Sequence, residues 1–296
     1  MTDGRVFPLI AISHGELAEL AGGAIARVEP VDGGLTNTIH KVTLVSGEAF
    51  AIKHHAGGNT PYDDEVATIA QLAGILPVPE VVRTDARRRA IVYRWIAGIT
   101  LDECRRNEPP AAFASLAEPL GRFLAWLATF GWTGTWDLAS ILAQSDAMLG
   151  AGRARERLGP QAADALRAAI DGAAPALAWG TPCLSHGDLG GRNMIVQHAM
   201  AGRWRIGGVI DWEAAALASP LVDIGSLFRD PTRYDATFLA DFERGYREAD
   251  GALPDGWFRA ARLLDALWLV ETLDEDRELP GVFADCRKLI AGFLAS

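Results

Sequence analysis

The stretch "LSHGDLGGRNMIV", residues 184–196, places a histidine, an aspartate, an arginine and an asparagine within eight residues and then ends in an apolar run. A second stretch, "GGVIDWEAA" (207–215), follows with another aspartate. Short apolar pieces within 183–210 have the length of strands, and the pattern on both sides is helical. We expect the two polar stretches to belong to one site that short strands hold in place.

Three side chains in these stretches suit phosphoryl transfer. This chemistry needs a carboxylate that orients or deprotonates the attacking hydroxyl, and oxygen ligands for Mg²⁺. Asp188 suits the first role. Asn193 and Asp211 suit the second, because each lies beside a predicted strand that can hold it rigidly.

The first hundred residues predict a small antiparallel sheet with one helix. Residues 39–53 and 79–96 each predict a hairpin, the first with its turn at Ser46-Gly47. Between them, residues 60–74 predict a helix with Thr60 as its N-cap.

The pattern turns helical beyond residue 98. Apolar residues at helical spacing predict a helix over 113–127 with a kink at Pro119. Further helices are predicted at 137–149, 161–178, 235–249, 255–276 and 282–294. We therefore expect an α+β fold of two lobes, a β-rich lobe over 1–96 and a helical lobe over 97–296.

The β-rich lobe offers a cation for the phosphates. Lys53 ends the predicted strand "AFAIK", and Glu65 on the next helix can pair with it, although Asp63 and Asp64 are alternative partners. Such a pair holds a lysine extended toward the α and β phosphates.

A glycine-containing turn lies upstream in "VDGGLTNT" (31–38). Gly33, Gly34 and Thr36 could bring backbone N–H groups close to phosphate, or form only a turn. Neither GxxxxGK[ST] nor GxGxxG occurs in the chain, so the sequence does not support a P-loop or a Rossmann site.

Composition narrows the class of partner. The 296 residues carry a formal net charge of −10, which argues against nucleic acid and suits a cationic small molecule, although many acidic proteins are simply soluble. Three scattered cysteines support neither a disulfide scaffold nor a zinc site. No apolar run is long enough to span a bilayer and no signal-peptide pattern is present, so we expect a cytoplasmic monomer or dimer without a membrane partner.

Five motifs in register carry a family resemblance. "AIK", a helix glutamate, "HGDLGGRN", "VIDWE" and "SPLVDIGSLFR", in this order, resemble the aminoglycoside phosphotransferase and choline kinase-like family, relatives of the protein kinases. The resemblance covers nearly the whole chain and is strongest over 184–229. It implies a bilobal protein-kinase-like fold that binds ATP or GTP with Mg²⁺. The lobe over 1–96 would bind the nucleotide, and the lobe over 97–296 would carry the catalytic loop and the acceptor site.

The resemblance also implies residue roles. Asp188 would be the catalytic aspartate, Asn193 and Asp211 the metal ligands, and Lys53 with Glu65 the phosphate-anchoring pair.

Further roles concern the surroundings of these groups. His186 would support the catalytic loop, as a structural residue or as a direct participant, and Asp223 would hydrogen-bond the backbone of that loop. In "IVYRWIAG" the Arg94 carbonyl and the Ile96 N–H would meet the purine edge, with Tyr93 at the back of the pocket.

Two residues depart from the pattern. Family members often read "HGDLHPGN", whereas "GGR" occupies 190–192 here, so Arg192 adds a cation that could contact phosphate or pair with an acidic neighbour. Trp212 follows the metal aspartate where protein kinases carry Phe, so we expect none of their activation-loop regulation.

One late segment, "DALWLVETLDEDRELPG" (265–281), suggests where the acceptor could bind. Trp268, Glu271 and Glu275 are spaced i, i+3, i+7 and could share a helix face that meets the ammonium groups of a substrate. The alternative is a solvated acidic helix end with Trp268 in the core.

The sequence thus predicts a kinase that phosphorylates a hydroxyl group of a small molecule, with an antibiotic of the aminoglycoside or macrolide type as the first expectation for the acceptor. The alternatives are a metabolic kinase for choline, homoserine, a sugar or an amino-sugar, and a pseudokinase that binds nucleotide without catalysis.

Overall fold

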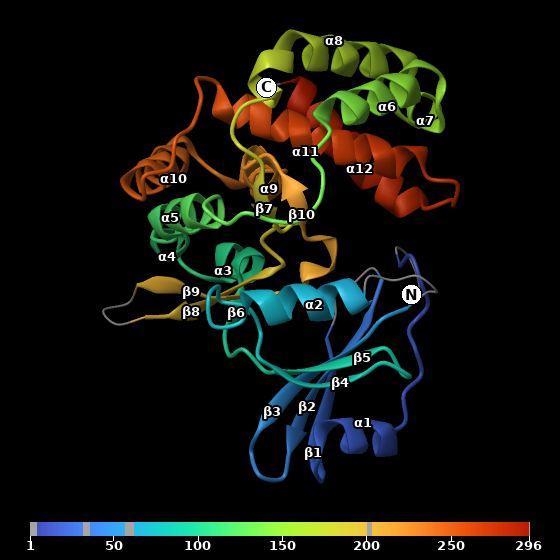
Figure 1. Ribbon diagram of the computed structural model, residues 1–296, viewed down its shortest axis with the longest axis vertical. Helices are drawn as coiled ribbons and strands as arrows, with labels where there is room; N and C mark the ends of the chain where they lie inside the picture. The colour runs from blue at the N-terminus through green and yellow to red at the C-terminus, as the bar shows by residue number, and fades with distance from the viewer. Residues whose placement is uncertain (1–4, 32–35, 57–61, 200–202, 296) are drawn as a thin grey trace. The chain divides into compact units, whose positions relative to one another are not determined.

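The computed structural model describes residues 5–31, 36–56, 62–199 and 203–295 (Figure 1). Contacts divide the chain into a sheet unit, Met1–Glu108 with Arg192–Ala214, and a helical unit, Pro109–Gly191 with Ala215–Ser296. This division differs from the predicted boundary at 96. The sheet unit continues to Glu108 and takes up a later segment, because strands formed after residue 192 pair with a strand at residue 99.

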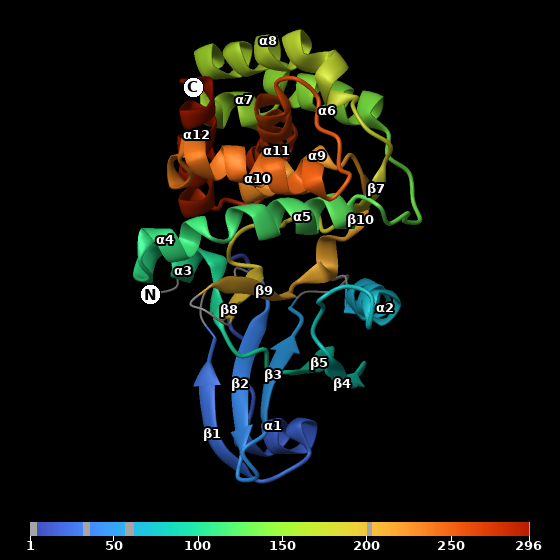
Figure 2. The same ribbon diagram turned by 90° about the vertical axis from the view of Figure 1, so that its left-hand side faces the viewer.

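The sheet unit is built on a five-stranded antiparallel sheet in the order β1-β2-β3-β5-β4 (Figure 2). Its strands are β1 (Ile25–Pro30), β2 (Thr38–Leu44), β3 (Ala49–His54), β4 (Val81–Asp85) and β5 (Ala90–Arg94). The first predicted hairpin is β2–β3, where Gly47 turns with φ 92° and donates its N–H to the Leu44 carbonyl at 2.9 Å. The second is β4–β5.

Two helices accompany this sheet. α1 (His14–Ala21), which the sequence reading missed, begins with a capping box between Ser13 and Glu16, and its apolar side packs on β2 and β3. α2 (Tyr62–Leu72) follows β3, as predicted. The proposed cap Thr60 lies outside the described residues.

A second, smaller sheet completes this unit. It has the order β6-β8-β9, formed by β6 (Ile99–Thr100), β8 (Met194–His198) and β9 (Trp204–Val209). α3 (Leu101–Asn107) extends directly from β6, and the short 3₁₀ helix η2 (Trp212–Ala214) follows β9 and packs against α2.

The helical unit places α11 at its centre, among α6, α7, α8, α9 and α12 (Figures 1 and 2). Its helices are α4 (Pro110–Ala114), α5 (Ala117–Leu127), α6 (Leu138–Ala151), α7 (Arg153–Leu158), α8 (Pro160–Leu177), α9 (Leu221–Leu227), α10 (Ala236–Glu248), α11 (Trp257–Asp274) and α12 (Pro280–Leu294), with the 3₁₀ helix η3 (Pro231–Arg233). Two short strands, β7 (Cys183–Ser185) and β10 (Ala216–Ala218), pair with each other.

One helix prediction is wrong in detail. The expected helix over 113–127 is two helices, α4 and α5, so Pro119 does not lie in the middle of one long helix. α5 begins at Ala117, so Pro119 lies in its first turn, where an N–H has no partner within the helix in any case.

α9 and α11 approach each other closely. A Cβ atom at Gly225 of α9 would lie 2.1 Å from the Ala261 carbonyl oxygen of α11, so only glycine fits at this crossing. Among the described helices, none is long and apolar enough to cross a membrane.

Candidate active site

Lys53 and Glu65 form the ion pair predicted from the sequence. Lys53 Nζ of β3 lies 2.7 Å from Glu65 Oε2 of α2, and both side chains are buried. Burial raises the pKa of Glu65, but the charge of Lys53 and the contact with His55 outweigh it and lower that pKa to about 2. Asp63 and Asp64 are exposed, so Glu65 is the partner.

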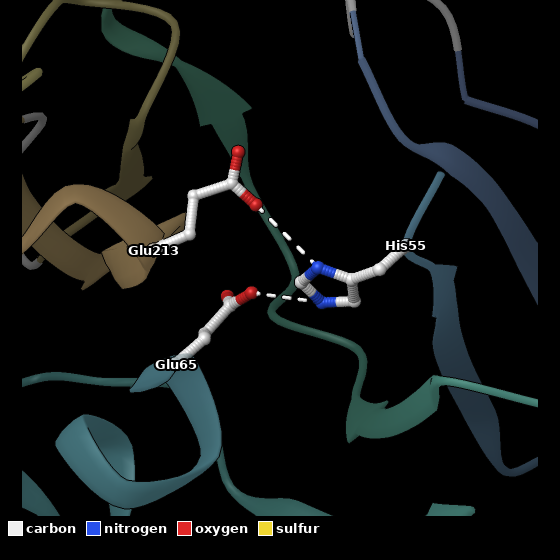
Figure 3. Close-up of side chains that lie close together, drawn as sticks. All are labelled: His55, Glu65 and Glu213. Carbon is white, nitrogen blue, oxygen red and sulfur yellow. Dashed lines mark ion pairs between the residues drawn. The ribbon is translucent and has the colours of Figure 1, made fainter. Parts of the chain in front are cut away.

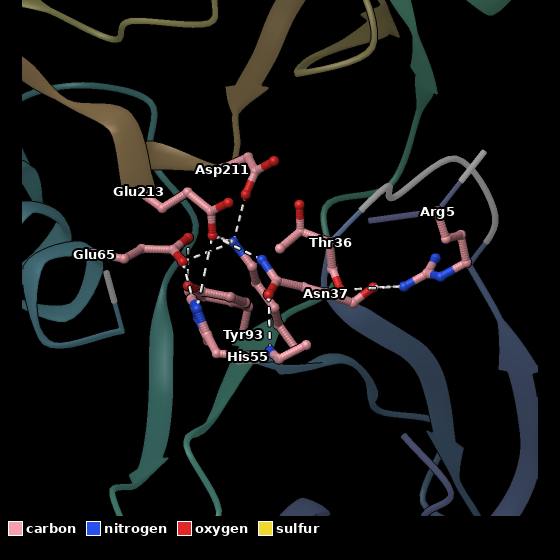
Figure 4. A network of polar contacts seen from close by, with 10 residues as sticks. Arg5, Thr36, Asn37, His55, Glu65, Tyr93, Asp211 and Glu213 are labelled. Carbon is pink, nitrogen blue, oxygen red and sulfur yellow. Dashed lines mark hydrogen bonds and ion pairs between the residues drawn. The ribbon is translucent and has the colours of Figure 1, made fainter. Parts of the chain in front are cut away.

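Two more carboxylates meet the same ammonium (Figure 4). Lys53 Nζ contacts Asp211 Oδ1 and lies 3.0 Å from Glu213 Oε2. Burial lowers the pKa of Lys53, but the charges of Asp211, Glu65 and Glu213 raise it above its ordinary value. The sequence reading gave Glu213 no role, although an acidic side chain two residues after Asp211 was a signal for one.

His55, also missed, lies between two of these carboxylates (Figure 3). Its Nε2 is 3.1 Å from Glu65 Oε2 and its Nδ1 is 3.7 Å from Glu213 Oε2, in a side chain with no exposed surface. The three side chains are close enough to hold a metal ion. The Lys53 ammonium, however, already contacts the same oxygen of each carboxylate, so His55 belongs to the surroundings of the lysine.

Asn37 ties the start of β2 to this network. Its Nδ2 donates to Glu213 Oε2 at 2.7 Å and its Oδ1 accepts from the Ala56 N–H at 3.2 Å. Arg5 Nη2 donates to the backbone carbonyls of Asn37 and Thr36, at 2.7 Å and 3.3 Å. Thr36 therefore lies beside the network, whereas Gly33 and Gly34 lie outside the described residues.

Asn193 and Asp211 lie at the same end of the β8–β9 ladder. The Ile210 N–H donates to the Asn193 carbonyl at 2.9 Å, next to the pair formed by Met194 and Val209. The Asn193 side chain is buried. Asp211 has φ 71°, a left-handed conformation that is rare outside glycine and often marks functional positions.

In the helical unit, Asp223 holds the loop that carries Asp188. Its carboxylate accepts from the backbone N–H groups of His186 at 2.8 Å and Gly187 at 3.0 Å, and from the Ser185 hydroxyl at 3.0 Å. Burial raises the pKa of Asp223, although the neighbouring His186 and these hydrogen bonds oppose it. The Asp188 N–H donates to His186 Nδ1 at 3.3 Å, so His186 supports the backbone at Asp188.

Comparison with protein families gives a match over most of the chain. The model of the phosphotransferase enzyme family (APH) matches residues 27–263, a span that includes Lys53, Asp188, Asn193 and Asp211. The chain belongs to this family. It is a phosphotransferase of the kind that acts on hydroxyl groups of small molecules. By sequence, no curated protein matches this phosphotransferase.

Solved structures share the bilobal, kinase-like α+β fold of the phosphotransferase. The GDP complex of wild-type aminoglycoside 2'-phosphotransferase-IIIa has a TM-score of 0.74 at 19% identity, over 94% of this chain and 96% of that one. Choline kinase LicA from Streptococcus pneumoniae has a TM-score of 0.70 at 16% identity, over 96% and 99%. Macrolide 2'-phosphotransferase MphH from Brachybacterium faecium has 0.67 at 18%, over 94% and 96%.

The segment predicted to meet the purine continues from β5 of the phosphotransferase. Arg94 is exposed, its N–H donates to the Glu80 carbonyl at 2.9 Å, and its Nε lies 2.8 Å from Glu80 Oε2. Ile96 is partly buried. Tyr93 is buried, and its hydroxyl donates to Glu65 Oε1 at 2.9 Å. The base contacts of Arg94 and Ile96 remain predictions.

The late acidic segment of the phosphotransferase is only partly as predicted. Trp268 is 43% exposed, so the alternative that places it in the core is wrong. Glu271 is exposed on the same helix, whereas Glu275 lies beyond the helix end, where its backbone carbonyl accepts from Arg157 at 2.7 Å.

The neighbouring acids have structural partners. Asp274 Oδ1 accepts from the Ala154 N–H at 2.8 Å, and Asp276 pairs with Arg153. Trp268 and Glu271 therefore remain the better candidates for substrate contacts. Arg192, the departure from the family pattern, is exposed.

Proposed function

We propose that this phosphotransferase transfers the γ-phosphoryl group of ATP or GTP to a hydroxyl group of an antibiotic of the aminoglycoside or macrolide type. The observation that carries the proposal is the buried Lys53 ammonium in contact with three carboxylates. Three negative charges against one positive charge leave a net negative site. Such a site suits a divalent cation that arrives with the phosphates of a nucleotide.

The residues of the sheet unit would bind the nucleotide and the metal. Lys53, paired with Glu65, would contact the α and β phosphates. Asn193 and Asp211 offer the amide and carboxylate oxygens that Mg²⁺ prefers, from one end of the β8–β9 ladder. When bound, Mg²⁺ neutralises charge on the phosphate oxygens. Asp211, whose carboxylate contacts Lys53, would be one of the two residues that hold the metal.

Asp188 would orient the acceptor hydroxyl and take its proton as the phosphoryl group transfers. Asp223 holds the loop of Asp188 by accepting the backbone N–H groups of His186 and Gly187. The N–H of Asp188 itself donates to His186 Nδ1. An orientation fixed in this way supports transfer, because positioning supplies most of the rate in this chemistry.

Support for an antibiotic acceptor comes from the structural relatives. Solved structures of similar fold include a GDP and kanamycin complex and a gentamicin complex of aminoglycoside phosphotransferases. The net charge of −10 suits a cationic aminoglycoside. The exposed Trp268 and Glu271 offer an aromatic face and a carboxylate for such a substrate.

A metabolic kinase is the second candidate. Choline kinase LicA aligns over 96% of this chain, and choline is also a cationic alcohol. A non-catalytic nucleotide-binding role has less support, because Lys53, Asp188, Asn193 and Asp211 are all retained and only catalysis needs all four.

The test is a nucleotide-turnover screen with Mg²⁺ and either ATP or GTP. The panel contains kanamycin, gentamicin, a macrolide, choline and homoserine, and mass spectrometry identifies a phosphorylated product. We expect one class to turn over, and Asp188→Ala to reduce kcat about 10²-fold or more, the usual effect of losing a general base.

Asp171→Ala is the matched control, because Asp171 is an exposed aspartate of α8 in the same unit. It should keep wild-type turnover. Undiminished turnover by pure Asp188→Ala protein would contradict the role of Asp188, and nucleotide binding without any phosphorylated product would favour a non-catalytic role.

A further inference from the structure

An arginine from a distant segment contacts the carboxylate of Asp188. Arg229 follows α9, and its Nη2 lies 3.3 Å from Asp188 Oδ1, across 41 residues of sequence. Both residues belong to the helical unit. The sequence reading assigned Arg229 no role.

Arg229 is itself held by a buried acid. Its Nε lies 3.0 Å from both oxygens of Asp265 on α11, and its Nη2 lies 2.8 Å from Asp265 Oδ1. Nη2 also lies 3.1 Å from the Ser226 hydroxyl. Burial raises the pKa of Asp265, and the charge of Arg229 opposes this shift.

An indole covers the guanidinium. The Arg229 Cζ lies 4.7 Å from the centre of the Trp268 ring, one helical turn beyond Asp265 on α11. A guanidinium over an indole face is stabilised by a cation–π interaction. Burial lowers the pKa of Arg229, but the charges of Asp265 and then Asp188 raise it above its ordinary value, so the group stays charged.

The contact distances of the Arg229 guanidinium indicate two different roles, one toward Asp265 and one toward Asp188. The contacts with Asp265, at 2.8 and 3.0 Å, are those of a close ion pair, whereas the contact with Asp188 is longer, at 3.3 Å. The charge of Arg229 is thus mainly balanced by Asp265. The remaining contact, from Arg229 Nη2 to Asp188 Oδ1, is directional and can set the orientation of the Asp188 carboxylate.

We propose that Arg229 is a positioning residue for Asp188, and that Asp265 and Trp268 fix the place from which it acts. This inference rests on the proposed role of Asp188 as the group that receives the acceptor proton. A displaced carboxylate would slow transfer, because an error of about 1 Å in such a group can cost roughly 10²-fold in rate. A merely structural Arg229 would instead serve only to neutralise Asp265.

The kinetic test avoids an unpaired buried charge. Arg229→Met alone would strand Asp265, so the main variant combines Arg229→Met with Asp265→Asn, beside Asp265→Asn alone and Arg229→Lys. With the acceptor identified by the screen, we expect the double variant to lose about 10- to 100-fold in kcat while the Kd for a fluorescent ATP or GTP analogue changes less than about twofold. Arg229→Lys should recover part of the loss, because it keeps the charge without the planar fork.

The control is Arg244→Met, since Arg244 also contacts two carboxylates, Glu118 and Asp241, within the helical unit. It should leave kcat unchanged. The proposal is overturned if the double variant keeps wild-type kcat, or if nucleotide affinity and kcat fall together.

A second measurement does not depend on activity. Asp188→Cys places a thiol beside Arg229, and its rate of alkylation by iodoacetamide against pH gives the pKa of that thiol. A neighbouring cation lowers a thiol pKa, by about 1 unit or more at this range, so the pKa should be lower with Arg229 present than in the background of the double variant. The native thiols stay unreactive, because burial raises their pKa to about 11 for Cys104 and Cys286 and about 12 for Cys183.

The two measurements separate the two failures. Equal thiol pKa values in both backgrounds would refute the contact between Arg229 and position 188. A shifted thiol pKa with no turnover of any acceptor would support the contact and contradict the proposed function instead.

Discussion

At the scale of the residue, Tyr93 links the predicted base-binding segment to the ion pair. Its hydroxyl donates to Glu65 Oε1 at 2.9 Å, while Glu65 Oε2 faces Lys53 at 2.7 Å. Burial and then the charge of Glu65 raise the pKa of Tyr93 well above its ordinary value, so the hydroxyl keeps its proton and remains a donor. Tyr93 therefore fixes the rotation of the Glu65 carboxylate.

Tyr93→Phe should lower the free energy of unfolding by about 1–3 kcal/mol, because a buried carboxylate oxygen loses its donor. We also expect a weaker Kd for ATP or GTP, since Glu65 would hold Lys53 less rigidly. Urea unfolding and nucleotide titration measure the two effects. A variant with wild-type values in both would show that Lys53 and His55 fix Glu65 without Tyr93.

Contacts between single residues show how much of the site could be predicted from the sequence. The pair of Lys53 and Glu65 could be predicted, because a lysine at a strand end and a glutamate on the next helix are twelve positions apart. Asn37 and Glu213 are 176 positions apart and Arg229 and Asp188 are 41 apart, and only the folded chain brings these side chains together.

At the scale of the element, Gly225 sets the distance between α9 and α11. The Cβ of any other residue would lie 2.1 Å from the Ala261 carbonyl oxygen. α9 carries Asp223 and Ser226, and α11 carries Asp265 and Trp268. This crossing therefore positions the groups that hold the Asp188 loop and Arg229.

Gly225→Ala should destabilise the protein by about 2 kcal/mol or more, because the added methyl group must push two packed helices apart. Gly292→Ala is the control, since a Cβ there meets nothing within 4 Å, and it should stabilise α12 by about 0.5–1 kcal/mol. Thermal unfolding distinguishes them. Equal melting temperatures for the two variants would mean that the α9–α11 crossing can relax freely.

Helices could be predicted where apolar residues repeat at helical spacing over a long segment. The helices α6, α8, α10, α11 and α12 all lie within a few residues of their predicted ranges. Short elements such as α3, α7 and α9 were missed, because seven or fewer residues carry too little periodicity. The break between α4 and α5 was also missed, since both helices present apolar residues at one continuing period.

At the scale of the whole molecule, stability should depend on mild acid through His54 of β3. Burial, and then the neighbouring His40, lower the pKa of His54 to about 4. In the unfolded chain a histidine has a pKa of about 6.5, so the unfolded state takes up a proton first as the pH falls. The stability contributed by neutral His54 is therefore complete above about pH 6.5 and is lost as the pH falls toward 4.

Urea unfolding at pH 7 and pH 5 should show a loss of about 1–2 kcal/mol in wild-type protein. His54→Leu should remove most of this difference, and the exposed His14→Leu should keep it. Glu65, whose pKa is lowered to about 2, contributes its own pH dependence only below this range. The same pH dependence in His54→Leu as in wild type would assign the effect to another group.

The discontinuous sheet unit has a consequence for protein synthesis. Residues 192–214, which complete this unit, are made after the 83 residues of Pro109–Gly191 that intervene. A nascent chain that has emerged as far as Glu108 already contains Lys53 and Glu65 but lacks Asp211 and Glu213. During synthesis, the Lys53 ammonium therefore lacks two of its three carboxylate partners until the ribosome has translated the helices α4 to α8 and the segment that follows them.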